Sequence, residues 1–200
     1  MPTPAERLSS LIGFLRKQPL LDLAARLAEP GEVFVVGGLV RNWLLGRGRD
    51  PAQGRRQAAG PDLLEPVDVD LAVRQEALEF SRRLARESGA RLVVLTEPDR
   101  TARLVLPDLV VDLTGFRRPS LAADLQARDF TVNALALDLR LALDPSGSGQ
   151  AELIDPCCGL ADLDQKLLVP AGPGVLREDP LRVLRAFRLG AELDFSLPAS

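Results

Sequence analysis

Length, composition and charge limit the classes to which this protein can belong. The chain of 200 residues is 46% hydrophobic and 26% charged, which is typical of a folded globular domain. Its net charge of −3 argues against a generally basic nucleic-acid binder, so an RNA or DNA partner would have to be held by a local patch or by something outside this chain. The absence of histidine argues against a zinc site and excludes Ser-His-Asp and Cys-His catalysis. No apolar run reaches the length of a membrane span and the N-terminus lacks a secretion pattern, so we expect a cytoplasmic protein without a membrane partner.

The first third of the chain predicts helices around one short strand. Apolar residues at helical spacing predict helices over 4–17 and 20–28. The β-branched run EVFVV, residues 32–36, predicts a strand that ends at Gly37-Gly38. LVRNWLLG follows as a helix that Gly46 closes. Residues 46–66 are rich in Gly, Pro and Arg without periodicity, which predicts a long loop.

The remainder of the chain predicts mainly strands and then helices. Strands are expected over 67–73, 91–95, 101–106 and 109–116. Helices are expected over 75–88, 121–126, 160–168 and 178–193, the last with Pro180 in its first turn. An apolar element covers 130–139, and 145–149 predicts a flexible loop. This order, without an internal repeat, indicates an α+β fold.

The strand VDVDLAV, residues 67–73, carries two acidic residues on one face. Side chains alternate along a strand, so Asp68 and Asp70 point the same way, about 6.6 Å apart. At an effective dielectric of about 20, their carboxylates repel by about 2.5 kcal/mol. An edge strand with solvated acids would explain the pair alone. However, Asp112 projects from the centre of LVVDLTGF, and if the two strands pair, three carboxylates converge where Mg²⁺ would neutralise them.

The segment VFVVGGLVRNWLL joins a strand to a helix through Gly37 and Gly38. Glycines let backbone amides approach a phosphate closely, and the start of a helix adds partial positive charge. Arg41 lies in the first turn of the helix, where it could reach the same anion. Alone, a Gly-Gly turn often only reverses the chain. Together with the acids of the next strand, it predicts a phosphate and metal site for nucleotide transfer.

Five segments carry a resemblance to a known family. In chain order they are GGLVR, DVDLAV, RDFTVNALALDL, LIDPCCGLADL and EDPLRVLRAFRLGAEL, over about residues 31–197. They resemble the head domain of class II tRNA nucleotidyltransferases (CCA-adding enzymes) and bacterial poly(A) polymerases. The resemblance implies a polymerase-β-like head with a mixed or antiparallel sheet flanked by helices. It further implies N-terminal helices over 1–30, the head over 31–170 and the start of a helical neck over 171–200.

The same resemblance implies an activity and a set of site residues. The activity is template-independent transfer of C or A from CTP or ATP to an RNA 3′ end, that of tRNA foremost, with two Mg²⁺ ions. The catalytic, metal-binding residues would be Asp68, Asp70 and Asp112. The nucleotide-binding residues would be Gly37, Gly38, Arg41, Arg128, Asp129, Asn133, Asp179, Arg182 and Arg185.

Base recognition by Asp179 and Arg182 also has a physical basis. Three residues apart on a helix, they share one face. A carboxylate accepts from an exocyclic amine while a guanidinium donates to ring acceptors, and adenine and cytosine both offer an amine beside a ring nitrogen. The pair therefore favours A and C over G and U. Taken alone, this spacing favours an ordinary ion pair on a helix surface.

The sequence departs from the family pattern in three places. Asn42 stands where the family usually has Asp, and Ala127 replaces the first residue of a common Arg pair. The insert over 46–66 is longer than the usual connection, and a solvated loop is a simpler explanation of its arginines than RNA contact.

Several alternatives stay open at this stage. CCA, CC, A and poly(A) addition all choose A or C and differ in when addition stops. A nucleotide- or RNA-binding module without catalysis is the alternative from another class. Because the helical neck would begin where the chain ends, we expect residues 1–200 to bind NTP and to hold tRNA weakly.

Overall fold

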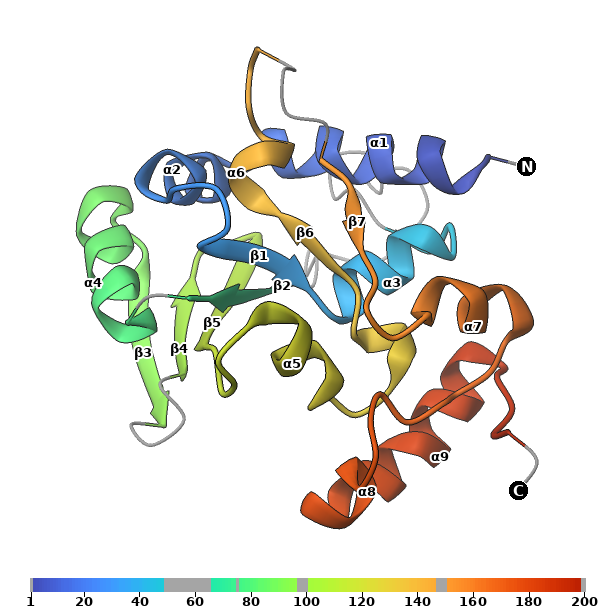
Figure 1. Ribbon diagram of the computed structural model, residues 1–200. Coiled ribbons are helices and arrows are strands. Elements are labelled where there is room, and N and C mark those ends of the chain that lie inside the picture. The colour runs from blue at the N-terminus through green and yellow to red at the C-terminus, as the bar shows by residue number, and fades with distance from the viewer. Residues whose placement is uncertain (1, 49–65, 75, 97–100, 147–150, 199–200) are drawn as a thin grey trace, which may run out of the picture.

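The described part of the computed structural model forms a mixed sheet covered by helices. Residues 2–48, 66–74, 76–96, 101–146 and 151–198 are described. The strand order is β3-β4-β5-β2-β1-β6-β7 (Figure 1). In chain order the strands are β1 (Val33–Val36), β2 (Val67–Val73), β3 (Arg91–Thr96), β4 (Thr101–Val105), β5 (Leu109–Gly115), β6 (Ala136–Asp138) and β7 (Leu153–Ile154). This arrangement confirms the predicted α+β head.

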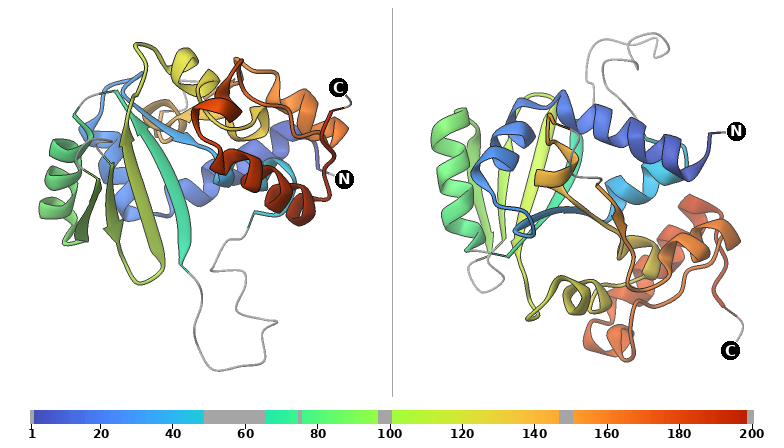
Figure 2. Two further views of the ribbon diagram at one scale, coloured as in Figure 1. Left: turned by 90° about the horizontal axis from the view of Figure 1, so that it is seen from below. Right: turned by 45° about the horizontal axis from the view of Figure 1, so that its top comes forward.

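The helices lie on both faces and at one end of this sheet. They are α1 (Pro4–Arg16), α2 (Pro19–Leu27), α3 (Gly38–Leu44), α4 (Ala77–Ser88), α5 (Leu121–Gln126), α6 (Leu139–Ala142), α7 (Gly159–Gln165), α8 (Val175–Glu178) and α9 (Leu181–Leu193), with a 3-10 turn at Thr131–Asn133. Seen from below, α4 and α9 lie on opposite sides of β2 and β5 (Figure 2). Within the described ranges, no helix is long and apolar enough to cross a membrane.

Alternation along the strands divides the hydrophobic residues between two faces. Val35, Leu71 and Leu113 face the main core, which also contains side chains of α1 to α4 and of α9. Phe34 and Ala72 face a smaller cluster beneath Leu125 of α5. The N-terminal helices thus share a core with the sheet. The division into 1–30, 31–170 and 171–200 stays a prediction.

The register of the central strands decides the position of the acids. β2 runs parallel to β5, with Asp70 beside Asp112, whereas β1 and β4 run antiparallel to their neighbours. Val36 of β1 lies beside Asp70, and Arg103 of β4 lies beside Asp112. One row across the sheet therefore reads Arg103, Asp112, Asp70, Val36, on the face opposite the main core.

Two sequence-based boundaries differ from the structure. The helix predicted over 178–193 is interrupted, because α8 ends at Glu178 and α9 begins at Leu181. The residue before a proline is disfavoured in helical conformation, and Asp179 before Pro180 is extended, with φ −141° and ψ 100°. Pro180 is therefore the N-cap of α9 and not part of its first turn. The apolar element over 130–139 contains the 3-10 turn and β6.

Two predicted loops fall wholly or partly outside the described residues. The loop expected over 46–66 includes 49–65, and the loop expected over 145–149 includes 147–149. The turn around Pro107-Asp108 is described and joins β4 to β5 as an antiparallel pair.

Candidate active site

Asp68 and Asp70 lie on the open face of β2, where the register brings Asp112 of β5 beside Asp70. Loss of water raises the pKa of the Asp70 carboxyl above its ordinary value. Arg128 opposes this shift of the pKa, while the negative charges of Asp112 and Asp68 add to it. Asp70 is exposed to the cavity that it lines, and the protein atoms around it reduce the hydration of its carboxylate. The three predicted acids are thus electrostatically coupled.

Asp112 is held by an arginine that the sequence analysis did not single out. Arg103 donates from Nε and Nη2 to the two carboxylate oxygens of Asp112, each at 2.7 Å. This hydrogen-bonded ion pair raises the pKa of the Arg103 guanidinium further above its usual range. Within the described ranges, no three acidic, thiol or imidazole side chains form a ready-made metal-binding group. The acids therefore share one face, but Asp112 is engaged by Arg103.

The Gly37-Gly38 turn lies directly beside Asp70. Gly37 has φ +73° and ψ −139°, a conformation that side chains strongly disfavour. A Cβ added to Gly37 would lie 3.1 Å from Oδ2 of Asp70. The turn is therefore pressed against the acid cluster, and α3 begins at Gly38 immediately after it. The phosphate-binding role of the glycines stays a prediction.

Arg41 lies behind this turn and is buried. It donates from Nη1 to Oδ1 of Asn133, and from Nε and Nη2 to Oδ1 of Asn42, at 3.1 and 3.0 Å. Burial lowers the pKa of the Arg41 guanidinium, and the charges of Glu192 and Asp129 oppose that shift. The neutral amide of Asn42 thus still accepts hydrogen bonds from Arg41, although the family usually has a carboxylate there.

The segment around Arg128 and Asp129 links the acids to α9. Burial lowers the pKa of Arg128, while the charges of Asp124 and Asp70 oppose that shift. The Nε of Arg128 is buried and has no hydrogen-bond partner in the described structure. Asp129 accepts from Nδ2 of Asn133 at 3.1 Å, and its Oδ2 lies 3.6 Å from Nη1 of Arg185.

Asp179 and Arg182 lie close together, but not on one helix as predicted, because Asp179 is extended before Pro180 and only Arg182 belongs to α9. The Nε of Arg182 is 3.8 Å from Oδ2 of Asp179, and its Nη1 donates to the carbonyl of Val175 at 3.1 Å. Oδ1 of Asp179 accepts from the backbone N–H of Leu181, the first residue of α9, at 3.0 Å. The two side chains are therefore oriented by α8 and α9 together.

One cavity of about 560 Å³ brings most of the predicted residues together. The predicted residues that line it are Gly37, Gly38, Asp70, Arg128, Asp129, Asn133, Asp179, Arg182 and Arg185. Asp68, Asp112 and Arg41 are not among its lining residues. The sheet wall carries the glycine turn and Asp70. A second wall, here called the α8–α9 wall, carries Asp179 from between α8 and α9, and Arg182 and Arg185 from α9.

Sequence reasoning missed further residues at this site. Thr114 and Arg117 line the cavity, and Arg103 binds Asp112. Strand alternation could have indicated Thr114, which follows Asp112 by two residues and shares its face. Arg103 projects from the centre of a predicted strand, but only the register places it beside Asp112. Arg47, assigned to a solvated loop, instead donates to the carbonyls of Glu192 and Leu193 at 3.0 and 3.3 Å.

A mixed sheet with acids on two parallel strands, beside a glycine turn at a helix start, is the arrangement of a polymerase-β-like nucleotidyltransferase head. Residues 33–169 match the family model of the Poly A polymerase head domain. The chain belongs to this family, which confirms the resemblance inferred from the sequence.

Related proteins share this part of their chain with it. A CC-adding tRNA nucleotidyltransferase of Synechocystis sp. (strain ATCC 27184 / PCC 6803 / Kazusa) is 37% identical over 183 residues, covering 92% of this chain and 38% of that protein. An A-adding tRNA nucleotidyltransferase of Aquifex aeolicus (strain VF5) is 33% identical, covering 84% and 19%. A solved CCA-adding enzyme with CTP superposes with a TM-score of 0.71 at 29% identity, covering 96% and 43%. The chain therefore spans less than half the length of these relatives.

Proposed function

We propose that this chain is the catalytic head of an enzyme that adds C, A or both to the 3′ end of tRNA from CTP and ATP. The observation that carries the proposal is the shared cavity. Groups suited to a triphosphate (Gly37, Gly38), to a metal ion (Asp70) and to a base edge (Asp179, Arg182) face the same space of about 560 Å³. An NTP bound there would meet all three kinds of group at once. A cytoplasmic location goes with this proposal.

The donor chemistry fits Mg²⁺, of which two ions are expected. Asp68 and Asp70 offer carboxylate oxygens, the ligands that this hard cation prefers. No described side chain donates a hydrogen bond to either carboxylate, and the raised pKa of Asp70 marks a carboxylate that a nearby cation would stabilise. Bound Mg²⁺ lowers the pKa of an attacking hydroxyl and stabilises the leaving pyrophosphate. We assign Asp68 and Asp70 as its principal ligands, and Asp112 as a ligand once Arg103 releases it.

The remaining residues would bind and orient the nucleotide. Backbone amides of the Gly37-Gly38 turn and the start of α3 suit phosphate oxygens. The buried, unpartnered Nε of Arg128 can donate to an anionic oxygen of the triphosphate. Asp179 would accept from the amine of adenine or cytosine, while Arg182 donates to the neighbouring ring acceptor. Asn133 and Arg185 hold Asp129, which lines the same wall.

The names of the relatives support tRNA as the substrate. The curated relatives are tRNA nucleotidyltransferases that differ in the nucleotides they add, while the cavity groups have no feature that separates C from A. We therefore propose tRNA 3′-end addition and leave the number of added nucleotides to experiment.

The proposal is tested by incubating the protein with tRNA that lacks its 3′ end, Mg²⁺ and labelled CTP or ATP. We expect Mg²⁺-dependent incorporation, and a loss of about a thousandfold in Asp70→Asn. Asp108→Asn is the matched control, because Asp108 is exposed in the turn before β5. Product length separates CC, A and CCA addition from poly(A) tailing. Nucleotide binding without turnover, in a longer polypeptide containing this chain, would instead support a non-catalytic module.

A further inference from the structure

The pair formed by Arg103 and Asp112 has a consequence for metal binding. Its two hydrogen bonds of 2.7 Å occupy both oxygens of the Asp112 carboxylate. The strand register sets the pair, because β4 places Arg103 directly beside Asp112 of β5. Bidentate pairing between a guanidinium and a carboxylate is strong and specific in geometry. A carboxylate held in this way has given about half of its four lone-pair sites to Arg103, and these are no longer available to an incoming cation.

The charge of Arg103 also reaches the other acids of the cluster. Asp68 and Asp70 both act electrostatically on its guanidinium, and Arg103 in turn favours the ionised form of Asp70. Arg128 supplies a second positive charge to Asp70 from the cavity wall. The cluster is therefore partly neutralised by the protein itself. Without Arg103, the coupled carboxylates would repel one another more strongly.

We propose that Arg103 is a positioning residue that balances the charge of the acid cluster and competes with divalent ions for Asp112. The proposal rests on the metal site of the proposed function. A cation that takes a lone pair already used by Arg103 must displace that hydrogen bond, and one that takes a remaining lone pair shares the oxygen with it. The positive charge of the guanidinium also opposes the approach of a cation. Arg103 thus keeps the head stable without metal, at the expense of metal affinity.

An ordinary cross-strand ion pair would behave differently. Such a pair contributes to stability alone, and its loss would lower stability by the same amount with and without metal. Competition predicts instead that removing Arg103 tightens metal binding and makes stability depend more strongly on metal. The sign of the change in affinity therefore separates the two explanations.

The first experiment measures Mn²⁺ binding by electron paramagnetic resonance to the chain and its variants. We expect Arg103→Gln to bind Mn²⁺ about tenfold more tightly, as the loss of one charge-assisted hydrogen bond implies. Arg103→Lys keeps the charge without the planar fork and should lie between the two. Arg83→Gln is the matched control, since Arg83 forms an exposed ion pair with Glu87 on α4, and should not alter binding. Unchanged or weaker binding by Arg103→Gln would overturn the inference.

The second experiment follows thermal unfolding in EDTA and in Mg²⁺. In EDTA, Arg103→Gln should unfold about 3 °C below the parent, and Mg²⁺ should restore most of that difference. An equal deficit under both conditions would mark an ordinary ion pair and overturn competition. Mn²⁺ binding by Asp70→Asn shows whether such a result contradicts only the role of Arg103 or the proposed metal site as well. If the parent binds Mn²⁺ and Asp70→Asn does not, the site stands whatever Arg103 does; if neither binds, both proposals fall.

Discussion

The two walls of the cavity are built in different ways. On the sheet wall, Asp70 and the Gly37-Gly38 turn are fixed by backbone hydrogen bonds and by the register of β1, β2 and β5. On the α8–α9 wall, Asp179 and Arg182 depend on side-chain contacts and on the interruption before Pro180. The proposed metal and phosphate contacts thus lie on the wall fixed by strand pairing, and the proposed base contacts lie on the wall fixed by side-chain contacts.

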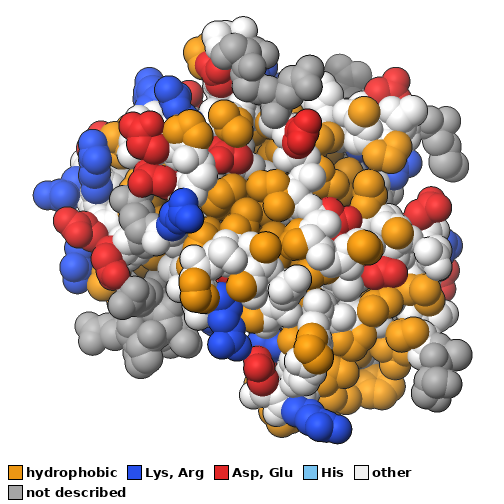
Figure 3. Space-filling model, in the orientation of Figure 1, with side chains coloured by type: hydrophobic (Ala, Val, Ile, Leu, Met, Phe, Trp, Pro, Cys, Tyr) orange, Lys and Arg blue, Asp and Glu red, His pale blue; other side chains and the backbone are white. Residues whose placement is uncertain are grey.

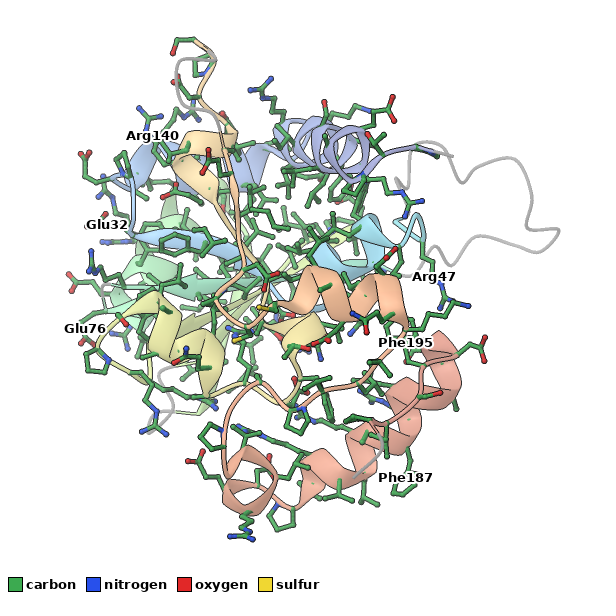
Figure 4. All side chains as sticks on the ribbon, turned by 45° about the vertical axis from the view of Figure 1, so that its right-hand side comes forward. Glu32, Arg47, Glu76, Arg140, Phe187 and Phe195 are labelled. Carbon is green, nitrogen blue, oxygen red and sulfur yellow. The ribbon has the colours of Figure 1, made fainter. Side chains whose placement is uncertain are left out.

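The attachment of α9 shows the same difference. Its inner side buries Ala186, Leu189 and Leu193 in the main core, while Arg47 binds the carbonyls at its end (Figure 4). Its outer side leaves large apolar residues exposed, which are Leu181 (63%), Val183 (42%), Leu184 (65%) and Phe187 (67%). This apolar patch lies over α8 and α9 in the lower right of Figure 3. Only one side of α9 therefore packs against the rest of the chain. Substitutions that loosen this packing should change base selection more than they change metal binding at the acid cluster.

Among the variants that compare the two walls, the largest effect is expected on the α8–α9 wall. Asp179→Asn keeps an oxygen that can cap Leu181 but introduces an amide donor opposite the base amine. We expect the preference for ATP and CTP over UTP and GTP to fall by about tenfold to a hundredfold. Equilibrium dialysis of the four nucleotides against the chain measures this preference. Arg177→Gln, exposed on α8, is the control and should keep it; an unchanged preference in Asp179→Asn would refute base reading.

On the sheet wall, Gly37→Ala should act through the fold. The substitution forces a side chain into φ +73° and places its Cβ 3.1 Å from Asp70. Strain of about 2 kcal/mol would lower the melting temperature by about 6 °C. Gly38→Ala is the matched control, because its Cβ would meet Nη2 of Arg41 at an ordinary 3.6 Å. Gly38→Ala should keep the melting temperature and weaken only nucleotide binding; equal melting temperatures of both variants would contradict the proposed close packing.

The sequence predicts the sheet wall better than the α8–α9 wall for a physical reason. Alternation of side chains is a local rule, and it places Asp68 and Asp70 on one face without knowledge of the fold. Pairing of Arg103 with Asp112 depends on register between strands, which alternation alone does not specify. The interruption at Asp179 could have been read from Pro180. The contact of Arg47 with α9 joins residues 145 positions apart, and no local pattern encodes it.

A smaller effect is expected where Arg47 holds α9. A cation at the last carbonyls of a helix interacts favourably with them, by about 0.5 kcal/mol at an exposed site. Arg47→Gln should therefore lower the melting temperature by about 2 °C and raise the Kd for CTP and ATP by less than about threefold. Arg26→Gln, which removes an exposed ion pair with Asp22 on α2, is the control and should leave nucleotide binding unchanged. Weaker Mn²⁺ binding in Arg47→Gln would show that the two walls are not independent.

The smallest expected effect tests whether the ionised carboxylate of Asp70 on the sheet wall lowers the stability of the fold. The pKa of Asp70 is raised in the folded protein above its ordinary value of 3.8, so the folded state binds this proton more tightly than the unfolded state. Ionised Asp70 therefore destabilises the fold above its folded pKa, and this cost disappears as the pH falls towards the unfolded pKa. In EDTA at neutral pH, Asp70→Asn should melt about 1–2 °C above the parent, and the difference should shrink towards pH 4. Asp108→Asn is the control and should show no such rise in melting temperature. If Asp70→Asn were instead less stable than the parent at neutral pH, the charges of Arg128 and Arg103 would more than offset the lost hydration of the Asp70 carboxylate.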